Sequence, residues 1–226
     1  YARVTFLLAI DSGEEDAALA TINSLQRMVN GNWKVLPILY TSDNWSKTAL
    51  LPSDDRVMQP LAFNELSSAL PSNNDCEFFV ICAAGDVFNR YLLGYFQAAL
   101  NGSPQADVYY YDCEHMSNDR SQSFPFFKPS GNSQELMISF NYLSRGFLRA
   151  VHINEIKQEI EQGTHLLVSE HDLMFKLLES GKSLCHVPYV LARQAPLNER
   201  VKFSINERIK DHFISKGFRN ARVDEI

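Results

Sequence analysis

The sequence lacks the glycine and cysteine patterns that mark the commonest small-molecule and metal sites. Its glycines form neither a GxGxxG fingerprint nor a P-loop, so neither a dinucleotide site nor a Walker-type site is supported. Its four cysteines are scattered without CxxC spacing, which argues against a structural zinc site. Without such pairs, the reducing cytoplasm is the default compartment.

Long apolar runs and blocks of one charge are also missing. No run approaches the roughly 20 apolar residues that a membrane-spanning helix needs, and no signal peptide is recognisable. The net charge of −6 is spread along the chain, which argues against a nucleic-acid-binding surface. We therefore expect a cytoplasmic protein with no transmembrane segment, either free or at the inner face of the membrane. Because the chain begins with Tyr1, other domains of a larger chain are candidate partners.

The first hundred residues alternate between apolar runs and helical patterns. Runs at 3–10, 33–40 and 78–84 are typical of strands buried in a parallel sheet. Apolar residues at helical spacing follow the first run over 14–29 and the third run over 91–100. This alternation predicts a parallel sheet with right-handed crossovers.

The run at 78–84 is the centre of this half, and it ends at Gly85 and Asp86. A polar turn after a buried strand lies at the carboxyl edge of the sheet, where open α/β folds bind their ligands. Asp86 could therefore bind a ligand, or it could N-cap the helix that follows. The two roles can coexist, and the residues alone leave both open.

The second half reads as a mixture of strands and helices. Residues 107–116 form an apolar run that turns acidic at its end, and 136–149 fit a helix or a helix–strand pair. The remaining pattern predicts a helix at 153–162, a helix at 170–180 capped by Ser169, a strand at 184–191, a helix at 198–216 and a short strand at 221–223.

Several of these segments carry short patterns in a fixed order. Residues 107–116 (DVYYYDCEHM) resemble DVVYSDEDxI, 126–129 (FFKP) resemble PxFKPxWS, and 136–142 resemble LLxxNYxG. Residues 169–173 (SEHDL) resemble the helix start EDxDLxxR, and 186–191 (HVPYVL) resemble HIPxVLY. Together they resemble bacterial glycosyltransferase family 2 over almost the whole chain. Each pattern is weak, but their order and spacing are specific.

The resemblance implies a fold and a division of the chain. We expect an α/β, GT-A-like fold with a mostly parallel central sheet flanked by helices. Residues 1–226 would form a single domain, with a nucleotide-sugar-binding half at 1–104 and an acceptor-side half at 105–226.

The resemblance also implies an inverting transfer from a nucleotide-sugar donor to a glycan or lipid-linked glycan acceptor, in bacterial surface polysaccharide synthesis. In the family, Mg²⁺ or Mn²⁺ on an Asp-rich motif offsets the charge of the leaving diphosphate, and a carboxylate deprotonates the acceptor hydroxyl. The matching positions are Glu170 for the base, Asp86 for the metal, Asp11, Asp43 and Asp86 for the nucleotide-sugar, and Asp112, Glu114, Lys128 and Asp172 for the acceptor side.

The donor-side motifs depart from the family pattern. The metal motif LDxDD reads CAAGD at 82–86, so Ala83 replaces its first acid and Asp86 alone remains. The acid of the DDxS motif is missing near 40–42 unless Asp43 substitutes for it, and Asp11 stands without its usual partner. Losing a ligand weakens a metal site, because water must supply the missing oxygen.

Two hypotheses therefore compete. The first is a divergent transferase, and the alternative is a catalytically impaired pseudo-glycosyltransferase that binds glycans or serves as a scaffold. A nucleotidyltransferase is less favoured, because no glycine-rich, basic phosphate loop follows the first apolar run.

Each candidate residue also has an ordinary structural interpretation. Glu170 and Asp172 could merely favour a helix N-terminus, Asp112 and Glu114 could be a solvated strand end, and Lys128 could be exposed. His115 and His171 fit solvated or hydrogen-bonded imidazoles better than metal ligands.

Overall fold

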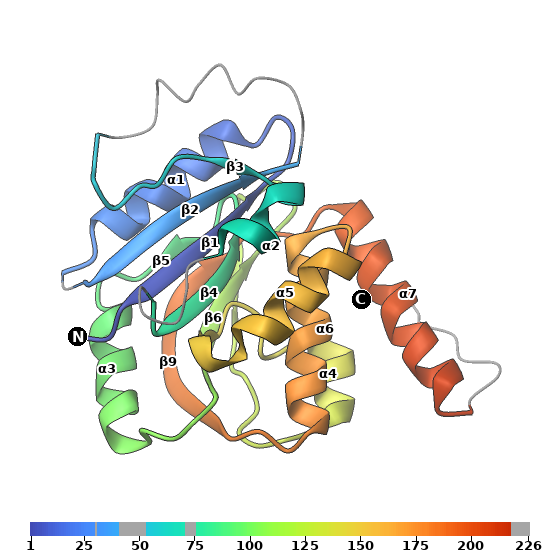
Figure 1. The fold of residues 1–226 in the computed structure, drawn as a ribbon. Helices are drawn as coiled ribbons and strands as arrows, with labels where there is room; N and C mark the ends of the chain where they lie inside the picture. Colours follow the sequence, from blue (N-terminus) through green and yellow to red (C-terminus); the bar gives the residue numbers. More distant parts are fainter. Residues whose placement is uncertain (30, 41–52, 71–75, 218–226) are drawn as a thin grey trace.

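A nine-stranded sheet organises the parts of the chain that the computed structural model describes, residues 1–29, 31–40, 53–70 and 76–217 (Figure 1). The strand order is β3-β2-β1-β4-β8-β6-β9-β5, and β7 pairs with β6. The strands are β1 Val4–Ile10, β2 Trp33–Leu39, β3 Leu61–Ala62, β4 Phe78–Ala83, β5 Val87–Phe88, β6 Val108–Met116, β7 Ser123–Phe126, β8 Phe147–Arg149 and β9 Leu184–Gln194.

The first half of the sheet is parallel, as the alternating pattern predicts. β1 pairs in parallel with both β2 and β4, and β2 pairs in parallel with β3. Every residue of β1 and β4 is buried, which explains why their sequences are continuous apolar runs rather than alternating ones.

The second half joins the first through β8. This short strand is antiparallel to both β4 and β6, and β9 then runs parallel to β6. The pairing of β6 with β9 shifts register on both sides of Asp112. Such an irregularity bends a strand and changes the direction of its side chains. It lies where the acidic end of β6 begins.

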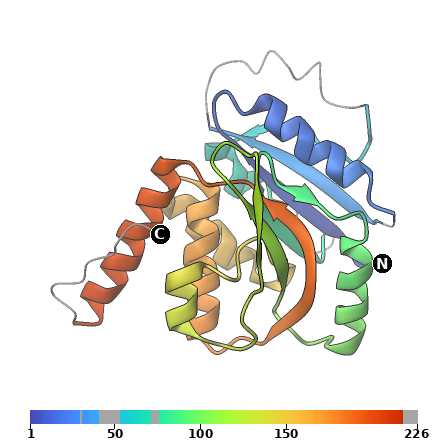
Figure 2. The ribbon, with the colours of Figure 1, turned by 180° about the vertical axis from the view of Figure 1, so that it is seen from behind.

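Helices cover both faces of the sheet, and the two views show α1 and α3 on the side away from α5 and α6 (Figures 1 and 2). One apolar cluster joins α1 and α3 to the sheet, and another joins α2, α4, α5, α6 and α7. The helices are α1 Glu15–Gln26, α2 Leu66–Ala69, α3 Leu92–Gly102, α4 Gln134–Phe140, α5 Ile153–Gln162, α6 Leu166–Glu179 and α7 Glu199–Ser215, with 3₁₀ turns η2 Phe63–Glu65 and η3 Ala150–His152. Among the described residues, no helix is long and apolar enough to span a bilayer.

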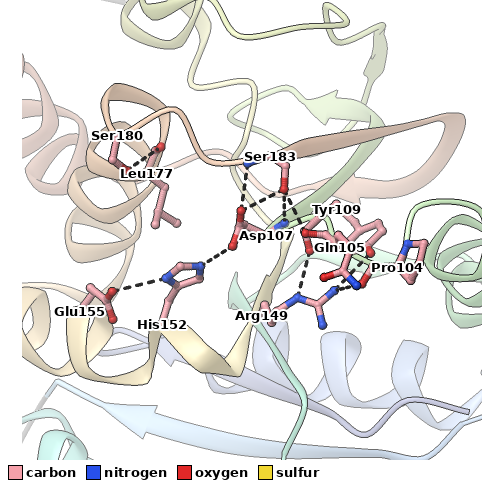
Figure 3. Close-up of polar contacts among 11 residues, drawn as sticks. Pro104, Gln105, Asp107, Tyr109, Arg149, His152, Glu155, Leu177, Ser180 and Ser183 are labelled. Atoms are coloured by element: carbon pink, nitrogen blue, oxygen red, sulfur yellow. Dashed lines mark hydrogen bonds and ion pairs between the residues drawn. The ribbon is translucent and has the colours of Figure 1, made fainter.

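A polar cluster ties the starts of β6 and β9 to η3 (Figure 3). The Asp107 carboxylate accepts a hydrogen bond from His152 Nε2 at 2.9 Å and two from Ser183, from its N and Oγ, both at 2.9 Å. Burial raises the pKa of Asp107, but the hydrogen bonds from His152 and Ser183 outweigh it, so the pKa is lowered overall. Arg149 fastens the preceding loop through the carbonyls of Ala106 and Pro104.

The start of α6 differs from the prediction. The helix begins at Leu166, four residues early, because His165 caps it by accepting a hydrogen bond from Leu167 N. Ser169 lies inside the helix and donates to the Glu159 carbonyl. Glu170 is therefore in the second turn, and the helix-terminus interpretation of Glu170 and Asp172 is wrong. The strand expected at 221–223 lies outside the described residues.

Candidate active site

The structure brings Asp86 and Glu170 together on one arginine. Arg145 lies in the turn between α4 and β8, and its Nε is 3.0 Å from Asp86 Oδ2. Its backbone N donates to Glu170 Oε1 at 2.7 Å, and its Nη1 lies 3.5 Å from Glu170 Oε2. All three residues are at most 2% exposed. The site is thus an enclosed cluster of two carboxylates and one guanidinium.

Asp86 is held by donors from three different segments. Gly85 adopts a φ of 95°, and the turn brings the Asp86 carboxylate back to Ala83 N, which donates to Oδ2 at 2.8 Å. Ala195 N, just past β9, donates to Oδ1 at 2.7 Å. The N-cap of α3 is Tyr91, so the expectation that Asp86 caps this helix is wrong. Asp86 instead fastens β4 to the end of β9 and to Arg145.

Sequence reasoning missed Arg145, although the sequence holds a usable signal. Arg145 stands in the apolar stretch 136–149, and an arginine that such a stretch buries needs a carboxylate partner. Its backbone is left-handed, with a φ of 59°, which directs the chain out of the turn toward β8. Neither Asp86 nor Glu170 is near it in sequence, so the pairing itself was not visible.

The electrostatics of the cluster favour a charged Arg145 and a partly protonated Glu170. Burial raises the pKa of Glu170 to about 7, and the nearby Arg145 only partly offsets this. Glu170 Oε2 makes no hydrogen bond with any described residue, which is consistent with a carboxylate that is costly to ionise. Burial opposes the charge of Arg145, but Asp86 and Glu170 together raise its pKa.

Lys128 and Asp112 form a second enclosed group beside the first. Lys128 Nζ donates to the Ser144 carbonyl at 2.9 Å, and Lys128 N donates to Asp112 Oδ1 at 2.8 Å. His186 Nε2 lies 2.8 Å from the same oxygen. Burial lowers the pKa of Lys128. Both residues are about 4% exposed, so the interpretations of Lys128 as exposed and of Asp112 as solvated are wrong.

Glu114 and Asp172 lie apart from this cluster, in partly exposed ion pairs. Glu114 Oε2 is 3.0 Å from Arg193 Nε, and Asp172 Oδ2 is 3.3 Å from Arg208 Nε. Hydrogen bonds from Arg193 and Ser123 lower the pKa of Glu114. An acceptor-side role for either acid stays a prediction.

Asp11 marks a separate corner at the end of β1. Its Oδ2 accepts a hydrogen bond from Asn198 Nδ2 at 2.6 Å and lies 3.3 Å from His165 Nε2. The His165 hydrogen bond is the main reason why the pKa of Asp11 is lowered, and the Asn198 bond adds to it. The His165 ring stacks on Tyr40 at 4.1 Å between centroids. The cavity beside Asp11 measures only about 10 Å³. Asp43 lies outside the described residues.

A larger cavity of about 310 Å³ lies beside Arg145. It is enclosed by the ends of β6 and β9, the turn after α4, and helices α6 and α7, and Arg145 itself is part of the wall. No aspartate or glutamate is among the described lining residues. These are His115, Met116, Asn118, Ile138, Phe140, Asn141, Ser144, Arg145, His171, Gln194, Ala195, Pro196, Leu197, Lys202, Ile205, Asn206 and Ile209.

The surroundings of Asp86 do not fit the expected Mg²⁺ or Mn²⁺. Its two oxygens already accept three hydrogen bonds, and the Arg145 guanidinium occupies the space where a cation would bind. Over the described residues, no group of three or more His, Cys, Asp or Glu side chains is arranged to hold a metal ion. A hard cation needs several oxygen ligands, which this cluster does not offer.

Comparison with known proteins gives a likeness in structure alone. No protein-family model matches the chain, and no curated protein matches it in sequence. Among solved structures, it is similar to TarS residues 1–349 from S. aureus in complex with UDP-GlcNAc, with a TM-score of 0.65 and 12% identity over 99% of this chain and 68% of that one. TarS is a GT-A-type glycosyltransferase. The chain has the GT-A fold.

Two further TarS structures agree with this assignment of the fold. A second structure of TarS residues 1–349 gives a TM-score of 0.62 at 11% identity, over 96% of this chain and 73% of that one. Against the longer TarS structure the TM-score is 0.63 at 11% identity, over 99% of this chain but only 41% of the other. The GT-A fold predicted from the ordered motifs is therefore confirmed, and the chain spans less than half of that longer protein.

Proposed function

We propose that this GT-A domain is a glycosyltransferase that moves a sugar from a nucleotide-sugar donor to a glycan or lipid-linked glycan acceptor, within bacterial surface polysaccharide synthesis. The observation that carries the proposal is the likeness, over 99% of the chain, to a structure that holds UDP-GlcNAc. The 310 Å³ cavity supports it, because it opens beside the ends of β6 and β9, where ligands of such sheets bind.

In the proposed reaction, the acceptor hydroxyl attacks the anomeric carbon of the donor with inversion. The hydroxyl proton passes to Glu170, and the nucleoside diphosphate leaves with the electron pair of the bond that breaks. A pKa of about 7 suits Glu170 to this step, since a general base works best near the working pH. Glu170 is enclosed with Arg145, so the guanidinium must move before an acceptor can reach the carboxylate.

A second function, binding without catalysis, is favoured by one specific observation. Both carboxylates that could act in transfer, Asp86 and Glu170, are at most 1% exposed and pair with Arg145. The described residues of the cavity wall include no carboxylate. A domain fixed in this state would bind a sugar ligand without transferring it.

Two measurements on the whole chain separate these functions. Calorimetric titration with UDP, GDP and dTDP tests donor binding, and release of sugar or diphosphate from nucleotide-sugars tests turnover. Glu170→Gln should keep nucleotide binding and lose turnover by at least about 100-fold, as expected when a general base is removed. Glu179→Gln, on the exposed part of the same helix, is the matched control and should keep both.

Each outcome decides between the proposals. If no nucleotide binds, the transferase proposal fails. Nucleotide binding with no turnover of any nucleotide-sugar favours the non-catalytic domain. If Glu170→Gln turns over as fast as the unmodified chain, Glu170 is not the base.

A further inference from the structure

The wall of the 310 Å³ cavity carries cationic side chains and no described anionic one. Arg145 comes from the α4–β8 turn and Lys202 from the first turns of α7. Arg145 uses Nε and Nη1 on its two carboxylates, and its Nη2 makes no hydrogen bond with a described residue. Lys202 pairs with Glu199, which points away on the exposed surface and does not line the cavity. The carboxylates of Asp86, Glu170 and Glu199 thus lie behind the two cations rather than among the described residues of the wall itself.

Several polar atoms in the same wall are buried without a hydrogen-bond partner among the described residues. They are Gln194 Nε2, Asn141 Oδ1 and both ring nitrogens of His171, although Asp172 Oδ1 lies 3.5 Å from His171 Nδ1. Gln194 and His171 are 6% and 3% exposed. Unsatisfied buried polar groups destabilise the folded state, so native proteins keep few of them. The interpretation of His171 as a solvated or hydrogen-bonded imidazole is therefore wrong.

The unpaired hydrogen-bond donors and acceptors in the wall suit a ligand that itself carries both acceptors and donors. The Gln194 amide N–H needs an acceptor such as a phosphate oxygen, and the Asn141 carbonyl needs a donor such as a sugar hydroxyl. His115 supplies no fixed positive charge, because burial and the nearby Lys128 and Arg145 lower its pKa. The charged side chains of the wall are thus Arg145 and Lys202.

The cavity also adjoins the corner at Asp11. Pro196 and Leu197 line both the large cavity and the 10 Å³ cavity beside Asp11. A nucleotide-sugar that enters the large cavity from the side of this corner would therefore place its diphosphate and sugar past Pro196, against Arg145 and Lys202. The large cavity is at the lower end of the size range for small-molecule sites, which suits a diphosphate and one sugar.

We propose that this cavity binds the diphosphate of the donor directly on Arg145 and Lys202, without a divalent metal ion. The proposal rests on the nucleotide-sugar donor proposed above. It adds which residues bind the negative charge of the donor diphosphate. Arginine matches phosphate oxygens with paired N–H groups, and lysine adds a point charge. A diphosphate at Arg145 would compete with Glu170 for the guanidinium, and this competition would release the carboxylate that the transfer step needs.

The test compares a lysine of α7 that lines the cavity with a lysine of the same helix that does not. Lys202 pairs with Glu199 and Lys210 pairs with Glu207, both as i,i+3 pairs, but only Lys202 lines the cavity. Pyrophosphate and UDP are titrated by calorimetry into the unmodified chain, Lys202→Gln and Lys210→Gln, first with EDTA and then with Mn²⁺. Unfolding by urea shows that all three proteins are folded.

We expect both ligands to bind with EDTA present. Lys202→Gln should weaken binding about five-fold, which corresponds to roughly 1 kcal/mol for a partly exposed charge, and Lys210→Gln by less than about two-fold. Raising the salt concentration should weaken binding in the unmodified chain.

Four results would overturn the proposal. Binding of UDP that appears only with Mn²⁺ would leave the transferase proposal intact and remove the metal-free site. Equal effects of the two lysine variants would place the anion elsewhere. Failure of pyrophosphate and UDP to bind under any condition would remove the site, and the transferase proposal would fail with it only if GDP and dTDP also do not bind. Failure of pyrophosphate alone would remove only the site.

Discussion

The Nε atom of Arg145 lies 3.0 Å from Oδ2 of Asp86, and neither side chain is more than 3% exposed. A buried ion pair is stable only when its remaining polar atoms are also satisfied. Asp86 meets this condition through Ala83 N and Ala195 N. The one acid that remains of the donor-side motif thus acts as a structural acceptor at the carboxyl end of β4.

Removing Asp86 should destabilise the fold strongly. Asp86→Ala leaves the Arg145 charge buried with Glu170 alone and leaves two backbone N–H groups without acceptors. We expect the free energy of unfolding, measured with urea, to fall by about 3–5 kcal/mol. Glu114→Ala is the control, because Glu114 also lies 3.0 Å from an arginine but is partly exposed, and it should cost at most about 1 kcal/mol. Equal costs would show that Asp86 does not hold the fold together.

The stability of the chain should depend on pH through Glu170. Its pKa is about 7 in the folded protein against 4.5 for the free side chain. Below pH 4.5 Glu170 is protonated in both the folded and the unfolded chain, and its contribution to the free energy of unfolding is complete. As pH rises toward 7 the unfolded chain releases its proton first, so the contribution of Glu170 is lost.

The measurement is urea unfolding of the unmodified chain and of Glu170→Gln across pH 4 to 8. Relative to the variant, the free energy of unfolding of the unmodified chain should fall by on the order of 3 kcal/mol from pH 4 to pH 8. Glu179→Gln provides the comparison for a partly exposed carboxyl on the same helix and should track the unmodified chain. A constant difference between the unmodified chain and Glu170→Gln would contradict the raised pKa.

Added Mn²⁺ should not stabilise the chain through Asp86. A ligand that binds only the folded state raises its stability, and the oxygens of Asp86 are already engaged. We expect the midpoint of urea unfolding to be the same with EDTA and with Mn²⁺. A rise with Mn²⁺ that Asp86→Asn abolishes would show that the aspartate does bind the metal.

Asn198 should contribute to stability in two ways that a pair of variants can separate. Its Oδ1 accepts from Val201 N at the start of α7, and its Nδ2 donates to Asp11. Asn198→Ala removes both bonds and should cost about 1–2 kcal/mol. Asn198→Asp keeps the cap but faces Asp11 with a second carboxylate, so its cost should shrink as the pH falls below about 4. A cost that does not change with pH would mean that Asp11 is not coupled to this position.

The sequence predicts those parts of the fold whose cause is local. The bounds of α5 and the N-cap of α7 follow from helical spacing and an asparagine, and β4 follows from its continuous apolar run. The start of α6 was missed because Ser169 is a common cap residue, whereas His165 acts as one here only through its Nδ1.

The family resemblance selected four residues that the structure brings close together, but not the arginine that joins two of them. The family resemblance selected Asp86, Glu170, Asp112 and Lys128, and the structure places them in two adjoining clusters. It could not show that Arg145, 59 positions from Asp86, joins the first two, because sequence spacing carries no information on such a contact. The sequence left Lys128 open between a ligand contact and an exposed side chain, and its burial was not predicted, since lysines seldom lose contact with water.

The two side-chain hydrogen bonds of Asn198 connect Asp11 to the start of helix α7. A ligand group that takes the place of Asn198 at Asp11 also disturbs the cap of α7, because the same amide makes both contacts. Helix α7 carries Lys202 and Ile205 into the wall of the large cavity. A ligand at the corner would therefore be linked thermodynamically to the shape of the cavity, and such linkage is reciprocal. Each half of a donor would change the affinity of the domain for the other half.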